Sequence, residues 1–138
     1  MSTINYDSFF YDVEVGNVDV DGDTFKLMLV TSSYTPSKAH GKRSDITNEV
    51  SGTGYSAGGK VVTLTPSLDT SNHRVDVTIG SVNWTSSTIT ARYGIIYKSR
   101  GGAASADELV CALDFGGDVT DTNGTFTVTP SSPLRISN

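Results

Sequence analysis

The chain has 138 residues, of which 36% are hydrophobic and 18% are charged, and its formal net charge is −5. This length suits a single domain, and the composition is not that of a charge-rich, apolar-poor disordered chain. No apolar run is long enough to cross a membrane, and no broad basic stripe is present to neutralise phosphates, so neither membrane binding nor nucleic-acid binding is expected.

Acidic residues gather at the start of the chain. Residues 1–23 contain six Asp or Glu and no Lys or Arg, whereas the remainder has nine acidic and ten basic residues. The first residues also lack the basic start and apolar stretch of a secretion signal. We therefore expect synthesis and folding in a cytoplasm, with an acidic surface confined to the N-terminal segment.

The N-terminal segment is compatible with both a helix and a strand. Four apolar residues are spaced so that they would lie on one face of a helix: Tyr6, Phe9, Phe10 and Val13. The valines of residues 13–20 favour a strand instead, and Gly16 would break a helix. The sequence predicts a short helix or arm up to about Val15, and a domain organisation of an arm or short helix over residues 1–22 and one β-sandwich over residues 23–138.

From Thr24 onward the sequence predicts strands. Apolar residues alternate with polar ones most clearly at residues 75–79, and weaker alternation occurs at residues 25–30, 60–65, 83–90, 91–99, 109–115, 126–128 and 134–136. Turn residues separate these stretches, including the Asn123-Gly124 pair. Seven to nine short strands at this spacing favour an all-β fold, an antiparallel β-sandwich of jelly-roll type. The polar connection over residues 32–50 is long enough to suggest a function or a reach to a neighbouring subunit.

Two short motifs resemble ligand-binding loops, but each lacks residues or neighbouring elements that such a loop requires. Residues 54–60 satisfy the spacing GxxxxGK, but Val61 replaces the Ser or Thr that holds magnesium, and strand formers follow instead of a helix. We interpret this stretch as a turn that lets two backbones approach closely. Asp19, Asp21 and Asp23 begin like a calcium loop, but the required Gly and Glu are missing, so a solvated acidic turn is the favoured interpretation over weak calcium binding.

Residues for catalysis are few. The two histidines, His40 and His73, lie among polar turn residues, and no GxSxG motif accompanies the many serines. Asp76 and Asp114 could approach each other across two sheets as a glycosidase pair, although outward-facing strand positions explain them more simply. Cys111 lies in an apolar run, which predicts a buried, inert thiol. We expect no catalytic residues, no metal site and no cofactor, and hence a protein that is not an enzyme.

Several stretches between residues 22 and 128 resemble small structural proteins of tailed-bacteriophage particles. These stretches are residues 22–29 (GDTFKLML), 45–55 (DITNEVSGTGY), 82–84 (VNW), 91–97 (ARYGIIY), 113–116 (LDFG) and 126–128 (FTV). The pattern is one of strands and glycine turns. It is moderately specific for proteins of phage particles, but it does not distinguish head proteins from tail proteins. Proteins of this kind include capsid cement, head decoration and tail-fibre proteins.

This resemblance implies a virion structural protein that is assembled in the host cytoplasm. The first expectation is a cement or decoration protein, a dimer or trimer bound to the major capsid protein, since a repeated lattice multiplies weak contacts into tight binding. The expected interface residues are the aromatic side chains of the N-terminal arm (Tyr6, Phe9, Phe10 and Tyr11) and a short basic cluster (Lys38, Lys42 and Arg43). The alternative for the basic cluster is a solvated loop without a partner.

The alternative is a tail or tail-fibre component that binds a receptor or a glycan. Sugars stack on exposed aromatic rings, and Trp84 and Tyr34 are the candidates for such a platform. Copy number per particle separates the two locations, because a shell protein is present in hundreds of copies and a tail protein in a handful.

Overall fold

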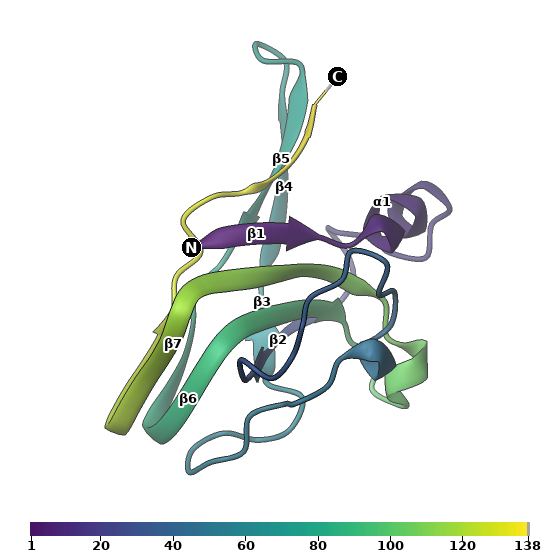
Figure 1. The fold of residues 1–138 in the computed structure, drawn as a ribbon. Helices are drawn as coiled ribbons and strands as arrows, with labels where there is room; N and C mark the ends of the chain where they lie inside the picture. The colour runs from purple at the N-terminus through teal and green to yellow at the C-terminus, as the bar shows by residue number, and fades with distance from the viewer. Residues whose placement is uncertain (138) are drawn as a thin grey trace.

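Residues 1–137 of the computed structural model form two antiparallel β-sheets and one short helix (Figure 1). The larger sheet has the strand order β1-β7-β6-β2-β3, and the smaller one has the order β4-β5-β8. The elements are β1 (Ser2–Asn5), α1 (Asp7–Glu14), β2 (Phe25–Val30), η1 (Arg43–Asp45), β3 (Lys60–Val62), β4 (Leu64–Asp69), β5 (Arg74–Ile79), β6 (Val82–Lys98), η2 (Ala104–Ala106), β7 (Leu109–Val128) and β8 (Leu134–Ser137). The predicted all-β, sandwich-like class is confirmed, and the jelly-roll variant stays a prediction.

A long bent hairpin of β6 and β7 forms the centre of the molecule. The two strands pair from Tyr97↔Leu109 to Val82↔Val128, with register shifts along the way. The sequence predicted two strands in each of these regions, which is wrong. Asn123 has a φ of 48° in mid-strand, so the Asn-Gly pair produces an irregularity within the ladder instead of a hairpin turn.

The main core lies between the two sheets and inside the bend of the hairpin. It contains Phe25, Leu27 and Leu29 from one face of β2, together with Trp84 of β6 and Phe126 of β7. Trp84 packs edge-on against Phe126, with 6.2 Å between ring centroids. This is the core that the period-2 pattern of the sequence predicts.

A second, smaller core covers the opposite face of the five-stranded sheet. Met28 and Val30 of β2 and Ile95 of β6 point into it, and the connection after β2 lies over them. Tyr34 from that connection is 2% exposed. The polar connection of residues 32–50 therefore contributes to the fold by closing this face.

The N-terminal segment is part of the main sheet. β1 pairs with β7 from Ser2↔Asp114 to Asn5↔Cys111 and forms one edge of the sheet. Helix α1 follows directly, in agreement with the predicted helix ending near Val15. The expectation of an arm that is separate from the β-domain is corrected for residues 2–5, because their backbone is hydrogen-bonded into the five-stranded sheet.

Candidate functional site

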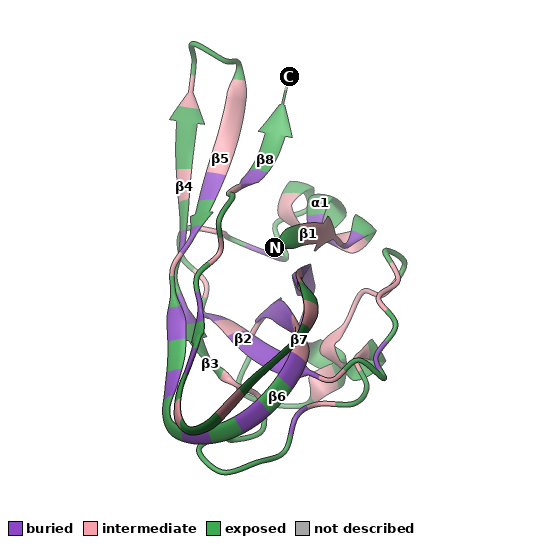
Figure 2. Cartoon of the chain, turned by 60° about the vertical axis from the view of Figure 1, so that its left-hand side comes forward, coloured by how far each residue is buried: buried purple, intermediate pink, exposed green. Residues whose placement is uncertain are grey.

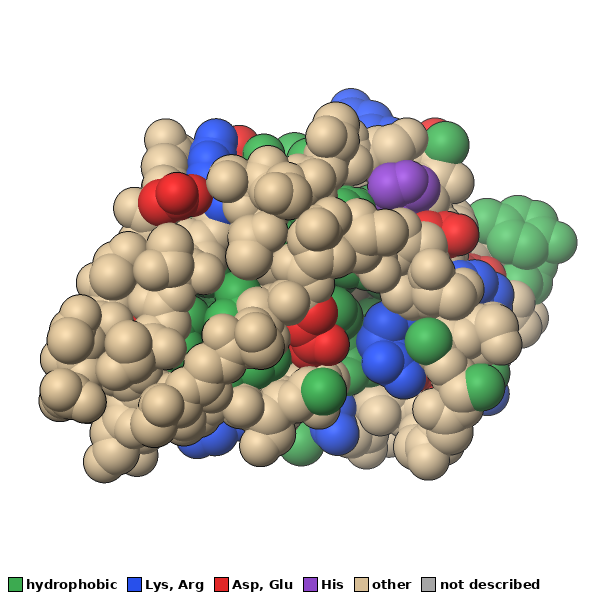
Figure 3. Space-filling view, turned by 60° about the horizontal axis from the view of Figure 1, so that its bottom comes forward, with side chains coloured by type: hydrophobic (Ala, Val, Ile, Leu, Met, Phe, Trp, Pro, Cys, Tyr) green, Lys and Arg blue, Asp and Glu red, His purple; other side chains and the backbone are tan. Residues whose placement is uncertain are grey.

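The aromatic residues of the N-terminal segment divide between core and surface. Tyr6 and Phe9 are 0% and 1% exposed, so the prediction that they anchor a partner is wrong. Tyr6 precedes α1 and points into the second core, and Phe9 points into the main core. Phe10 and Tyr11 lie on the outer side of α1 and are 38% and 66% exposed. Figure 3 shows hydrophobic side chains projecting at the edge of the molecule where Figure 1 places α1.

The predicted basic interface residues are mostly engaged within the chain. Arg43 Nε lies 2.7 Å from Asp107 Oδ2, and the Arg43 guanidinium stacks 5.1 Å from the centre of the Tyr97 ring. Lys42 Nζ lies 3.9 Å from Glu108 Oε2. Arg43 thus pairs with a buried carboxylate, which corrects its assignment as an interface residue, whereas the Lys42 side chain is 44% exposed and its interface role stays a prediction. Lys38 is exposed and stays a prediction.

Asp107 and Glu108, which the sequence analysis missed, are each 1% exposed. Arg100 binds both oxygens of Glu108, with Nε–Oε1 at 2.6 Å and Nη2–Oε2 at 3.1 Å. The hydrogen bond to Glu108 raises the pKa of Arg100. Buried carboxylates need such partners, and here the partners fasten the connection around η1 to the end of the β6–β7 hairpin. The adjacent Asp-Glu pair before an apolar run carried no signal that either side chain is buried.

The other candidate residues of the sequence lie apart from any common site. Asp19 Oδ1 accepts hydrogen bonds from the backbone nitrogens of Asp21 and Gly22, and Asp23 pairs with Lys98 at 2.8 Å. Desolvation acts to raise the pKa of Asp23, but the hydrogen bonds to Lys98 and to the backbone of Asp19, together with the positive charges of Lys98 and Arg100, outweigh it and the pKa is lowered. Within residues 1–137, no group of three His, Cys, Asp or Glu side chains is arranged to hold a metal ion.

The proposed aromatic sugar platform is also corrected. Trp84 and Tyr34 are 1% and 2% exposed, so neither ring is available for stacking on a ligand. Trp84 lies in the main core and Tyr34 in the second one. Cys111 is fully buried, as predicted, and burial raises the pKa of its thiol to about 12.

The three-stranded sheet extends beyond the body of the molecule (Figure 2). Its apolar face consists of three successive rows across the paired strands. Leu64 and Ile79 are buried, and the next row, with Pro66, Val77 and Leu134, is largely buried. In the last row, Leu68 is 74% exposed and Ile136 42% exposed, on either side of Val75. The strands therefore continue their apolar pattern past the point where the body covers them.

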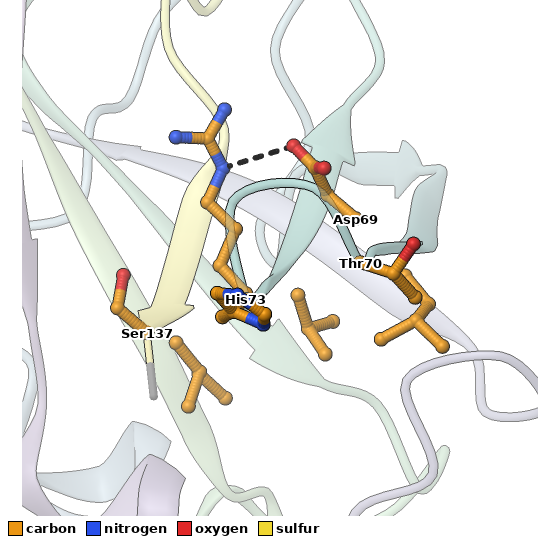
Figure 4. A pocket seen from close by; sticks show the side chains of 8 residues that line it. Asp69, Thr70, His73 and Ser137 are labelled. Carbon is orange, nitrogen blue, oxygen red and sulfur yellow. Dashed lines mark ion pairs between the residues drawn. The ribbon is translucent and has the colours of Figure 1, made fainter.

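Two hollows of about 440 Å³ each flank this last row. The first lies near the tip of the β4–β5 hairpin, and Figure 4 shows Asp69, Thr70, His73 and Ser137 around it. An ion pair of 3.4 Å joins Arg74 to Asp69 there. This hollow is polar at its rim and open to solvent.

The second hollow, here called the α1 groove, separates the sheet from α1 and the turn after it. Its lining is mostly apolar: Phe9, Val13, Val18, Val20, Pro66, Val75, Val77 and Ile136. Asp19 and Asp21 are the two charged residues that line it. A concave apolar surface with a few charged groups at its edge is the usual form of a binding site, and the α1 groove with the last row of the sheet is the candidate site.

No protein-family model matches the chain, and neither a curated protein nor a solved structure matches it significantly. Within residues 1–137, no helix combines the length and apolar character needed to cross a lipid bilayer.

Proposed function

We propose that the chain is a structural protein of a tailed-phage particle, a capsid cement or decoration protein that stabilises the major capsid shell by protein–protein contacts. The observation that carries this proposal is the apolar face of the three-stranded sheet, which continues beyond the body and ends in the exposed Leu68 and Ile136. Complete burial of such a side chain contributes about 1.5–3 kcal/mol. A surface of this kind is suited to contact with another protein.

Two further features support this proposal. The strand and glycine-turn pattern between residues 22 and 128 resembles that of phage particle proteins. The exposed Phe10 and Tyr11 on α1 add aromatic side chains next to the α1 groove, and aromatic residues are enriched at interfaces. A dimer or trimer on a symmetric shell would repeat each of these contacts many times.

The test is the copy number of this chain in purified virions of the phage that encodes it. In a stained gel, its band is compared with the band of the major capsid protein after correction for mass. We expect hundreds of copies per particle, as the shell location requires. A handful of copies would place the chain in the tail, and its absence from washed particles would overturn the proposal.

A further inference from the structure

The two outer strands of the three-stranded sheet differ in how they present their free edges. β4 contains Pro66, which has no N–H to donate, and proline at this position is a common protection of an edge strand. β8 pairs with β5 through residues 134–137 and has no proline within its bounds. Its other edge therefore offers backbone donors and acceptors to a further strand.

The α1 groove lies along this same strand. Ile136 of β8 lines the groove together with Val75 and Val77 of β5, and α1 contributes Phe9 and Val13 from the opposite side. A strand added to β8 would place every second side chain on the apolar face of the sheet. Those side chains would enter the groove, while the others would point away from it.

The groove also selects for charge. Asp19 and Asp21 line it, and neither forms an ion pair with any Lys or Arg of residues 1–137. They belong to the N-terminal 23 residues, which carry six acidic and no basic residues. Lys or Arg at the ends of a bound segment would compensate these carboxylates.

We propose that the free edge of β8 and the α1 groove bind one extended segment of a partner protein, which has apolar residues at alternate positions and Lys or Arg at its ends. Such strand addition derives affinity from main-chain hydrogen bonds and specificity from alternate side chains. Only the identity of the partner rests on the proposed function. If that function is right, the partner is a capsid protein that contains such a segment.

A single extended segment fits better than the three-stranded sheet of a second copy. Figures 1 and 2 both place α1 on the side of the free edge of β8. An added strand needs only about 4.8 Å beside β8. A second copy paired through β8 would bring its own Asp19 and Asp21 to the same groove, and like charges at an interface weaken binding.

The first experiment measures binding of synthetic peptides to the full chain by calorimetry and by amide shifts in NMR spectra. The probe, called the Val-Lys peptide, is a capped octapeptide with a Lys at each end and three Val-Thr pairs between them. Its controls are a peptide of the same composition in which the three Val precede the three Thr, a peptide with Glu in place of both Lys (the Val-Glu peptide), and the Val-Lys peptide N-methylated at alternate residues. We expect at least about tenfold weaker binding of each control, which corresponds to about 1.4 kcal/mol, and the largest amide shifts in residues 134–137.

Two variants locate the site. Ile136→Asp places a charge in the groove and should weaken binding of the Val-Lys peptide at least about tenfold, whereas the matched control Val61→Asp, at a position that is 62% exposed on β3, should bind like the wild type. Asp21→Lys should reverse the charge preference, so that the Val-Glu peptide binds better than the Val-Lys peptide. This second variant lies in a solvent-exposed turn and tests the proposal even where Ile136→Asp weakens folding.

Equal binding of all four peptides, or binding that neither variant changes, would overturn the proposal. Concentration-dependent dimerisation in sedimentation that Ile136→Asp abolishes would also overturn it, because the edge would then serve a second copy. Peptide binding with the chain absent from virions would refute the proposed function and leave the binding site itself supported.

Discussion

Tyr34 connects two hydrogen-bonding partners in the second core. Its hydroxyl lies 2.9 Å from Tyr6 Oη and 2.9 Å from His40 Nδ1. Burial is the main cause that raises the pKa of both tyrosines, so they stay protonated and each must donate a hydrogen bond. Within residues 1–137, Tyr6 Oη bonds to Tyr34 alone. The arrangement that satisfies both donors runs from Tyr6 to Tyr34 to Nδ1 of His40, which accepts the last hydrogen bond.

Removing the two hydroxyls should have unequal effects. Tyr34→Phe leaves the buried Tyr6 hydroxyl without an acceptor and should cost about 1–3 kcal/mol of the free energy of unfolding. Tyr6→Phe leaves Tyr34 still donating to His40 and should cost about 0.5–1.5 kcal/mol. Urea unfolding of the two variants and the double variant measures both costs. Equal costs would contradict this direction of donation.

Cys111 should be unreactive in the folded protein. It is fully buried, and burial raises the pKa of its thiol to about 12, so the reactive thiolate is scarce at neutral pH. We expect a thiol reagent such as iodoacetamide to label the chain in denaturant and to leave it unlabelled in native buffer over the same time. Mass spectrometry of the intact chain reads out the result, and rapid native labelling would mean that β7 opens readily.

The sequence predicted some of these residues well and others poorly, for a physical reason. Cys111 lies in an apolar run, and such a run is buried in any β arrangement. Tyr6 and Phe10 belong to the same apolar stripe, yet one is buried and the other exposed. Their difference depends on where β1 places the start of α1, and that depends on pairing with a strand far along the chain. Local periodicity contains no information about such pairing.

At the scale of elements, the turn before β3 is set by a close backbone approach. Gly59 has a φ of 77°, and a Cβ there would lie 1.9 Å from the carbonyl oxygen of Leu27 on β2. This is the close approach that the sequence analysis inferred for the GxxxxGK stretch. Tyr97 Oη donates to the carbonyl of Gly58 at 2.6 Å, and Glu49 accepts from the backbone nitrogen of Gly58 at 2.7 Å. The glycines thus fasten β3 to its neighbours.

Alanine at this turn should therefore be far more harmful than alanine at a comparable open position. Gly59→Ala combines left-handed backbone strain with a clash against β2 and should cost on the order of 4 kcal/mol or prevent folding. Gly101→Ala is the matched control, because Gly101 has a φ of 78° but no atom within 4 Å of the added carbon, and it should cost about 1–2 kcal/mol. Thermal unfolding compares the two, and similar melting temperatures would refute the close approach.

The strand boundaries were harder to predict than the strand positions. β5 appears where alternation is clean and β8 where it is weaker, whereas β6 and β7 run through segments that the sequence divides. Ser87 donates to Asp121 across the hairpin, and Asp121 also accepts from the backbone nitrogen of Ile89 at 2.8 Å. These cross-strand bonds hold an irregular stretch in the ladder. The candidate site escaped the sequence analysis for a similar reason, since an overhang is visible only when the sheets are placed together.

At the scale of the whole molecule, the N-terminal segment completes both the sheet and the two cores. β1 forms an edge of the five-stranded sheet, Tyr6 fills the second core and Phe9 the main core. The acidic residues of this segment therefore belong to the folded body instead of a separate arm. Any interface there involves a rigid surface, with Phe10 and Tyr11 presented by α1.

Deletion of residues 2–15 should accordingly unfold the domain. The deletion removes an edge strand and two buried aromatic side chains, and a single Phe→Ala exchange in a core costs about 3–5 kcal/mol. The double variant Phe10→Ser/Tyr11→Ser is the control, because both side chains are exposed and its melting temperature should change little. Circular dichroism on heating gives the result, and a cooperative transition in the truncated chain would show that the segment is dispensable for folding.

The pairing of β1 with β7 has a consequence for biosynthesis. The partners of residues 2–5 are residues 111–114, so the ribosome delivers one strand long before the other. Until then, the aromatic side chains that follow β1 have no completed interior to enter. Contacts between residues far apart in the sequence slow folding and prolong the lifetime of aggregation-prone intermediates with exposed apolar surface. Nascent chains of this protein should therefore depend on chaperones more than the small size of the finished domain suggests.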